Sequence, residues 1–263
     1  MHGWILLLAL LLACNACAAD VPAQPAKVLF VGNSLTYVGN LPATYAALSA
    51  ANGHPVHSQM IVKGGAFLDE RHADGSLQRA LAEQHPQVLV LQEQGGALLC
   101  MPDEATCARS RNAVAAMAQL GREHGAKVLL LGSYQAHPAV SRLLIAKESA
   151  AAQAANVPYV EISEALRNAA TAAPDLPWYD TDGMHPGPAL TLLDAIQLYR
   201  TIHGHLPQHG FTVTAPIYTP KSGLDAALRN ADDNAPLAGT PSQIDYPEAM
   251  IHRLNTLLAP QQP

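Results

Sequence analysis

The sequence has 263 residues, which is enough for one large α/β domain with a buried core and too few to favour two such domains. Hydrophobic residues make up 49% of it and charged residues 14%, a balance typical of a compact globular domain rather than of a disordered or repeat-built chain. The formal net charge is −6 and no Lys/Arg run occurs. We therefore expect no nucleic-acid partner and no attraction to an anionic membrane surface.

The N-terminal segment, residues 1–19, is typical of a signal peptide. An apolar run over residues 4–13 is followed by small residues, and the run is about half of the ~20 residues that cross a bilayer. The segment before the run offers the terminal amine and His2 in place of Lys or Arg. We expect an exported protein, periplasmic or secreted, with residues 20–26 as a tether and residues 27–263 as the folded domain.

Two processing positions fit this segment. Residues 16–18 have the A-x-A form, and cleavage after Ala18 gives a soluble product. Residues 11–14 resemble a bacterial lipobox, in which Cys14 receives a lipid that would be the protein's only link to a membrane. Cysteine parity favours the soluble form, because cleavage at Cys14 leaves Cys17 without a partner.

The rest of the chain alternates short apolar runs with longer helical patterns. Such strands, separated by helices, predict a three-layer α/β/α sandwich around a mainly parallel, five-stranded sheet. Residues 204–245 are rich in Pro, Gly, Asn and Asp, and we expect them to be mostly loop. The expected strands are 28–31, 56–62, 88–91, 128–131 and 159–162, and the expected helices are 42–51, 77–84, 105–124, 141–155, 188–203 and 247–258.

The first strand leads directly into Gly32, Asn33 and Ser34. In open parallel sheets ligands bind beyond the carboxyl ends of the strands, so a serine here is a candidate nucleophile. Gly32 permits a tight turn, and a backbone N–H near a helix start can face a developing negative charge. The structural alternative is that Ser34 caps a helix.

Near the other end of the chain, Asp182 stands three residues before His185 in a glycine-containing segment that precedes the expected helix at 188–203. A serine hydroxyl needs a base to remove its proton, and the imidazole needs a carboxylate to fix its tautomer. This short segment can supply both groups. Its structural alternative is a capped turn or a surface pair.

Together these two segments resemble the SGNH (GDSL-like) hydrolases, in which G-D-S-L follows the first strand and D-x-x-H lies near the C-terminus. The resemblance covers residues 28–199. It implies a flavodoxin-like sheet, ester hydrolysis through an acyl-serine, and no metal or organic cofactor. Ser34 would be the nucleophile, His185 the base and then the acid, and Asp182 the orienting carboxylate. The α/β-hydrolases instead place their serine in G-x-S-x-G after a later strand, a pattern that does not surround Ser34.

The resemblance also implies an oxyanion hole, which would use the backbone amides of Ser34 and Gly65, with Gly64 as the rival glycine. The family's third donor is the asparagine of G-x-N-D, which this sequence lacks. Gln94 stands at that position, and Gln92 carries the alternative amide. Between them lies Glu93, which could tune the site but which we interpret as a solvated carboxylate at a strand end.

Other polar residues are assigned structural roles. Cys100 and Cys107 remain as an even pair after cleavage at Ala18, and they flank a short loop, so we expect a disulfide rather than a metal site or a catalytic thiol. The remaining histidines include one H-x-H spacing, His203 with His205, but no completing ligand set, and we expect no metal. The other histidines considered as possible metal ligands are His54, His57 and His209.

Tyr134 and Gln135 follow the fourth strand and are expected to line the substrate pocket.

The expected activity is hydrolysis of short acyl groups, acetyl above all, from carbohydrate or a similar small-molecule ester. Only three Phe and two Trp are present, so no broad aromatic platform for lipid or sugar is evident. Two alternatives stay open. One is a noncatalytic carbohydrate-binding or cell-surface protein that retains the fold, since fold does not prove activity, and the other is a lipid esterase.

Overall fold

A computed structural model describes residues 25–233 and 242–259. The predicted signal peptide, the lipid-attachment position Cys14 and most of the predicted tether lie outside these residues. The first strand begins at Ala26, so the last residue assigned to the tether belongs to the sheet. Within the two described ranges, no helix combines the length and the apolarity needed to span a membrane.

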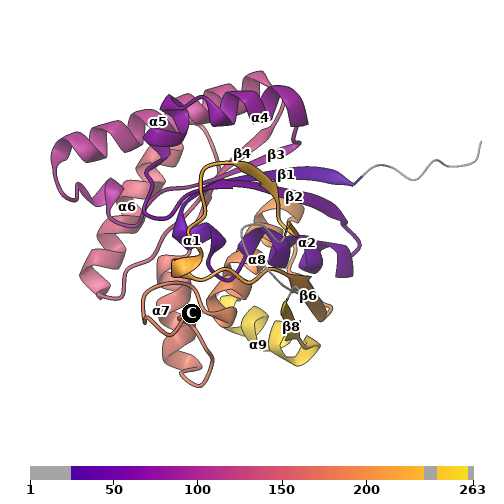
Figure 1. Cartoon of the computed structure of the whole chain (residues 1–263). Coiled ribbons are helices and arrows are strands. Elements are labelled where there is room, and N and C mark those ends of the chain that lie inside the picture. The colour runs from indigo at the N-terminus through magenta and orange to yellow at the C-terminus, as the bar shows by residue number, and fades with distance from the viewer. Residues whose placement is uncertain (1–24, 234–241, 260–263) are drawn as a thin grey trace, which may run out of the picture.

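A six-stranded sheet forms the centre of the molecule, in the order β5-β4-β3-β1-β2-β7 (Figure 1). The five predicted strands are present and parallel, and the order 2-1-3-4-5 is that of flavodoxin-like sheets. The prediction of five strands is wrong by one: β7 (Leu228–Asn230) pairs antiparallel with β2. The parallel strands are β1 (Ala26–Gly32), β2 (Val56–Val62), β3 (Val88–Gln92), β4 (Lys127–Leu131) and β5 (Tyr159–Val160).

Helices cover both faces of this sheet, which confirms the α/β/α sandwich (Figure 1). Side chains alternate between the faces along β1: Val28 and Phe30 pack into one hydrophobic cluster, and Leu29 and Val31 into the other. The first cluster also takes residues from α1 (Ser34–Tyr37), α2 (Leu41–Ala51), α7 (Ser163–Ala172), α8 (Pro188–His203) and α9 (Glu248–Leu258). The second takes residues from α3 (Leu68–Ala73), α4 (Ser76–Gln84), α5 (Glu104–Glu123) and α6 (Pro138–Ala154).

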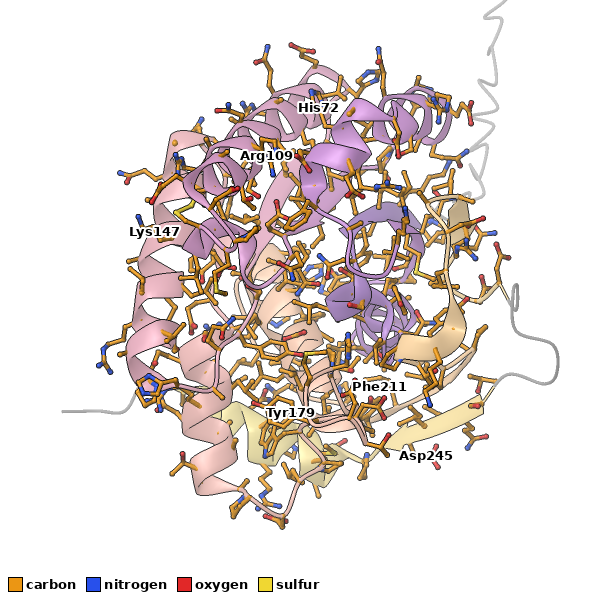
Figure 2. All side chains as sticks on the ribbon, turned by 60° about the vertical axis from the view of Figure 1, so that its left-hand side comes forward. His72, Arg109, Lys147, Tyr179, Phe211 and Asp245 are labelled. Carbon is orange, nitrogen blue, oxygen red and sulfur yellow. A yellow bond between two sulfur atoms is a disulfide. The ribbon has the colours of Figure 1, made fainter. Side chains whose placement is uncertain are left out.

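Figure 2 shows side chains of the helices that cover the second of these faces. The labelled Lys147 points outward from α6, whereas the next residue, Glu148, is buried. On the same face of the sheet, the labelled Arg109 of α5 lies near α3, where its guanidinium pairs with Asp69 at 3.1 Å.

The segment 204–245 is more structured than predicted. It contains β6 (Phe211–Ala215), η2 (Pro220–Ser222) and β7, and β6 pairs antiparallel with β8 (Ser242–Tyr246). In β6 the exposed Thr212 and Thr214 alternate with the buried Val213 and Ala215. This period of two is too short to stand out among the surrounding Pro and Gly residues.

Candidate active site

The turn after β1 presents Ser34 at the carboxyl edge of the sheet, next to β3. Asn33 is the N-cap of α1: its Oδ1 accepts from the Leu35 N–H at 3.0 Å, and its Nδ2 donates to the Gln92 carbonyl at 3.3 Å. A Cβ on Gly32 would lie 2.2 Å from Thr36 Oγ1, so this close turn requires glycine. The capping role that Ser34 could have played therefore belongs to Asn33, and Ser34 is partly exposed.

The loop before α8 brings Asp182 and His185 into direct contact. Asp182 Oδ2 lies 2.6 Å from His185 Nδ1, while Asp182 Oδ1 accepts from the backbone N–H groups of His185 and Met184, both at 2.9 Å. These bonds, led by the one from the His185 backbone, lower the pKa of Asp182 to about 2. The carboxylate therefore remains ionised at neutral pH, and it holds the imidazole in one orientation.

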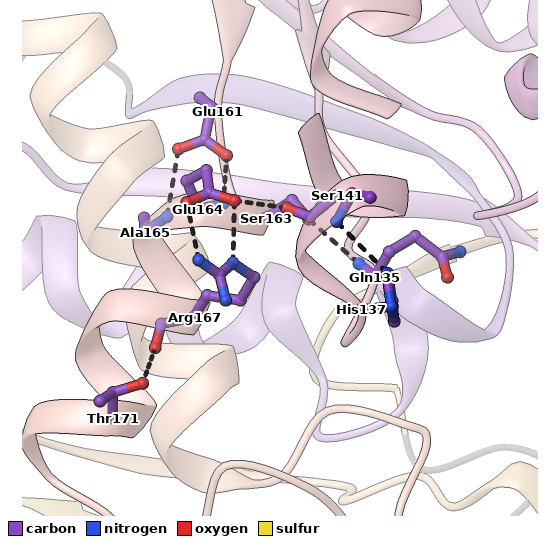
Figure 3. A network of polar contacts seen from close by, with 10 residues as sticks. Gln135, His137, Ser141, Glu161, Ser163, Glu164, Ala165, Arg167 and Thr171 are labelled. Atoms are coloured by element: carbon purple, nitrogen blue, oxygen red, sulfur yellow. Dashed lines mark hydrogen bonds and ion pairs between the residues drawn. The ribbon is translucent and has the colours of Figure 1, made fainter. Parts of the chain in front are cut away.

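Tyr134, just beyond β4, fixes the same loop from the side. Its hydroxyl donates to the Met184 carbonyl at 2.7 Å. Its neighbour Gln135 is held at both ends: its backbone N–H donates to Ser163 Oγ at 3.0 Å (Figure 3), and its Nε2 donates to the Gly95 carbonyl at 3.0 Å. The sequence predicted that Tyr134 and Gln135 line the substrate pocket. It did not predict their hydrogen bonds, because the bonding partners are distant in the chain.

All these segments border one cavity of about 700 Å³. The candidate nucleophile Ser34 and the candidate base His185 both line it, together with Gly65 and Gln94. The chain thus brings together, from four separate segments, every residue assigned to the site except Asp182, which lies behind His185. The remaining lining residues are Asn33, Leu35, Tyr37, Gly64, Phe67, Gly95, Gly96, Met101, Pro102, Tyr134, Gln135, Met184 and Pro220.

The two glycines after β2 both reach this cavity but differ in conformation. Gly65 has a φ of +69°, a left-handed backbone that favours glycine, in a turn closed by the Ala66 N–H to Lys63 carbonyl bond. Gly64 lies close to Tyr37, whose hydroxyl would be 3.0 Å from an added Cβ. Both positions thus have a structural reason for glycine, independent of the predicted role in an oxyanion hole.

The two glutamine candidates have different surroundings. Gln92 is 1% exposed and does not line the cavity: its Oε1 accepts from Thr36 Oγ1 at 2.7 Å and its Nε2 donates to the Gly132 carbonyl at 3.2 Å. Gln94 lines the cavity, and its Oε1 accepts from the Gly96 N–H at 3.1 Å. This bond leaves the Gln94 amide nitrogen as the end that can donate to a ligand.

Glu93 is not the solvated carboxylate that the sequence suggested. It is 1% exposed, and its Oε1 accepts from the backbone N–H groups of Leu68 at 3.1 Å and Gln94 at 2.8 Å. Burial raises its pKa to about 7. A strand-end carboxylate in a sequence gives no sign of such burial, because the covering residues come from α3 and α5.

Cys100 and Cys107 form the predicted disulfide, and the loop that it closes contributes Met101 and Pro102 to the cavity. Within the described residues, the grouping with metal-ligand spacing is Cys100, Glu104 and Cys107, but its two sulfur atoms are bonded to each other and are not thiolate ligands.

The histidines that were considered as possible metal ligands do not line this cavity. His203 stacks on His54 with ring centroids 4.0 Å apart, and His205 lies 6.3 Å from His203. His57 contacts Asn230, and His209 lies 3.6 Å from Glu248.

No protein-family model matches the sequence, and no curated protein matches it. Solved structures do. A protein of Slackia heliotrinireducens assigned to the SGNH hydrolases superposes with a TM-score of 0.58 at 23% identity, over 68% of this chain and 100% of its own. TesA gives 0.52 at 21% identity, over 68% and 98%. Axe2, an acetylxylan esterase of Geobacillus stearothermophilus, gives 0.52 at 14% identity, over 68% and 94%.

At such identities the likeness concerns the backbone. It agrees with the flavodoxin-like strand order of the central sheet. The chain has the fold of the SGNH hydrolases.

Proposed function

We propose that this protein is an exported serine esterase that hydrolyses oxygen esters through an acyl-serine intermediate. One observation supports this above all. Ser34 and the Asp182–His185 pair come from distant parts of the chain, yet Ser34 and His185 border the same cavity, with amide groups around them. A noncatalytic protein has no need to combine a partly exposed serine with a histidine held by a charged carboxylate.

In the proposed reaction His185 accepts the Ser34 hydroxyl proton as the oxygen attacks the ester carbonyl. The negative charge that grows on the carbonyl oxygen is stabilised by the backbone amides of Ser34 and Gly65 and by the Gln94 side chain. His185 then donates the proton to the leaving alcohol. Water, deprotonated by His185, attacks the acyl group, and the Ser34 oxygen leaves and regains a proton. Asp182 remains ionised throughout and stabilises the imidazolium.

The proposed substrate is a short acyl ester of a neutral, hydroxyl-rich alcohol such as a sugar, and the surroundings of Ser34 support the neutral alcohol. Among the residues that line the cavity, the ionisable side chains are His185, Tyr37 and Tyr134, so a charged group would enter without a counter-charge. A second cavity of about 440 Å³ shares Pro220 with the first and is lined by Asp180, Thr181, Asp182, Thr219 and Lys221. Such groups hydrogen-bond to sugar hydroxyls.

Export is part of the same proposal. The predicted signal peptide supports it, and a disulfide in the folded chain is typical of proteins that mature in an oxidising compartment. Lipid attachment at Cys14 and a soluble product remain alternatives. Intact-mass analysis of the protein expressed in a bacterial host distinguishes them, since a lipid-bearing N-terminus adds acyl chains to the mature mass.

The decisive experiment compares the mature protein with Ser34→Ala on an aryl acetate, on acyl esters of graded length and on acetylated oligosaccharides. We expect hydrolysis by the wild type and a loss of ~10³-fold or more in Ser34→Ala, with an unchanged unfolding curve. Equal rates in the two proteins would rule out the serine esterase. Binding of oligosaccharide without turnover would favour the noncatalytic alternative, and a rate that rises with acyl length would favour a lipid esterase.

A further inference from the structure

We infer that Glu93 is a positioning residue, which ties together two of the three segments that supply the proposed oxyanion donors. The inference rests on the proposed esterase function, and it concerns a residue that touches neither Ser34 nor His185. One carboxylate oxygen, Oε1, accepts from the Leu68 and Gln94 backbone amides at once. Leu68 begins α3, three residues after Gly65, and Gln94 carries the side-chain donor.

These two segments need such a connection because they leave different strands. The one that follows β2 contains Lys63, Gly64 and Gly65, all exposed, and its own turn is closed by a single backbone bond, from the Ala66 N–H to the Lys63 carbonyl. The one that follows β3 is held more firmly, since Gln94 receives bonds from Gly96 and Ala97. Glu93 therefore anchors the looser segment to the firmer one.

The environment of Glu93 suits a fixed connection rather than a group that exchanges with solvent. The side chain is 1% exposed, so the two bonds lie in a low dielectric, where a hydrogen bond is stronger than in water. The nearest charged neighbour on α3, Asp69, is paired with Arg109 of α5. Both the carboxylate and the carboxylic acid offer an oxygen acceptor to the two amides, so the connection does not depend on the charge of Glu93.

Oxyanion stabilisation depends on donors that are in place before the charge develops, because their reorganisation would otherwise add to the barrier. A displacement of about 1 Å from the productive geometry can cost ~10²-fold in rate. Loss of the Glu93 acceptor frees the Leu68 and Gln94 amides together. The result should be a lower kcat, by about 10- to 100-fold, with little change in KM, because the donors act mainly on the transition state.

The test compares Glu93→Ala and Glu93→Gln. Glutamine keeps an oxygen in the same place, so we expect Glu93→Gln to retain most of the wild-type kcat. The matched control is Glu161→Ala: Glu161 also accepts from two backbone amides after a strand, those of Glu164 and Ala165 (Figure 3), but it does not line the cavity. We expect Glu161→Ala to lower the unfolding temperature and to leave kcat unchanged. Rates on an aryl acetate are normalised to the sites labelled by a fluorophosphonate, so that misfolded protein does not count.

A wild-type kcat in Glu93→Ala would overturn the inference, and so would an equal loss of kcat in Glu161→Ala or a failure of Glu93→Gln to restore the rate. If Glu93→Ala does not fold, Glu93→Asp replaces it, since the shorter side chain cannot reach both amides and should lower kcat in the same way. Amide hydrogen exchange over residues 63–68 and 92–96 provides a readout that needs no turnover. Faster exchange in both segments is expected for Glu93→Ala and not for Glu161→Ala; unchanged exchange would refute the connection, even if the wild type proved inactive and the esterase proposal failed.

Discussion

Separate replacement of Gln94 and Gln92 should distinguish a residue that acts in catalysis from one that stabilises the fold. Gln94 lines the cavity with its amide nitrogen free to donate, so Gln94→Ala removes one oxyanion donor. The loss of one such donor costs about 2.7 to 4 kcal/mol of transition-state stabilisation, or ~10² to 10³ in kcat. KM should change much less, since the donor binds the charged intermediate more strongly than the neutral ester.

Gln92→Ala should have the opposite effect. The buried Gln92 amide bonds to Thr36 Oγ1 and to the Gly132 carbonyl, and each buried partner left unpaired costs roughly 1 to 3 kcal/mol. We expect a loss of about 3 kcal/mol in the free energy of unfolding, which for a chain of this size lowers the unfolding temperature by roughly 6 to 12 °C. The kcat of the folded fraction should fall by less than ~10-fold, through displacement of the turn that carries Ser34.

The assay is hydrolysis of an aryl acetate under saturating substrate, with urea unfolding of each variant in the same buffer. Gln94→Ala should unfold close to the wild-type midpoint, because its side chain is partly exposed. If the two effects are exchanged, Gln92 is the donor. If neither variant affects kcat, the proposed oxyanion hole is wrong.

Three further outcomes are expected. Tyr134→Phe removes the bond to the Met184 carbonyl, and at about 1 kcal/mol for one neutral hydrogen bond kcat/KM should fall ~5-fold; a wild-type value would mean that the loop is held without it. Burial raises the pKa of Glu148 from 4.5 to about 7, so the folded state keeps a proton that the unfolded state releases, and stability is lost as pH rises through that interval. Relative to the wild type, Glu148→Gln should therefore gain up to about 3 kcal/mol between pH 4.5 and pH 8 in urea unfolding, and a pH-independent difference would contradict the burial argument. Intact-mass analysis should show two added hydrogens on reduction of the Cys100–Cys107 disulfide, whereas free thiols that are alkylated in unreduced protein would exclude it.

The sequence predicted the parts of the fold that depend on local patterns. The strands and the long helices have continuous apolar runs or helical periodicity, and their bounds agree with the structure to within a few residues. The short elements α1, α3 and β7 were missed because three to six residues hold no usable period. The helix α7, which has ten residues, was missed as well, and its length does not explain the miss. The strand expected at 159–162 ends at Val160, and Glu161 beyond it accepts from two amides in the first turn of α7.

At the candidate site the sequence predicted which residue types would be present but not how they are held. Ser34 and the Asp182–His185 pair were evident from motifs, and Gln94 from its position after a strand. The choice between Gln94 and Gln92 depends on contacts with Thr36 and Gly132, which no local pattern encodes. The burial of Glu93 likewise depends on helices that cover it from elsewhere in the chain.

The two outer strands of the sheet have a consequence for self-association. One edge ends in β5, which has two residues, and the other in β7, which has three. An edge strand is a template on which another chain can add a strand, and short edges are one way in which natural proteins prevent this. The apolar strands β1 and β3 are paired on both sides, and β4 is paired with β5 at Leu130 and Leu131. In the described part of the chain, the central sheet thus exposes only a few residues of unpaired backbone, and concentrated solutions of the folded protein should resist edge-to-edge aggregation.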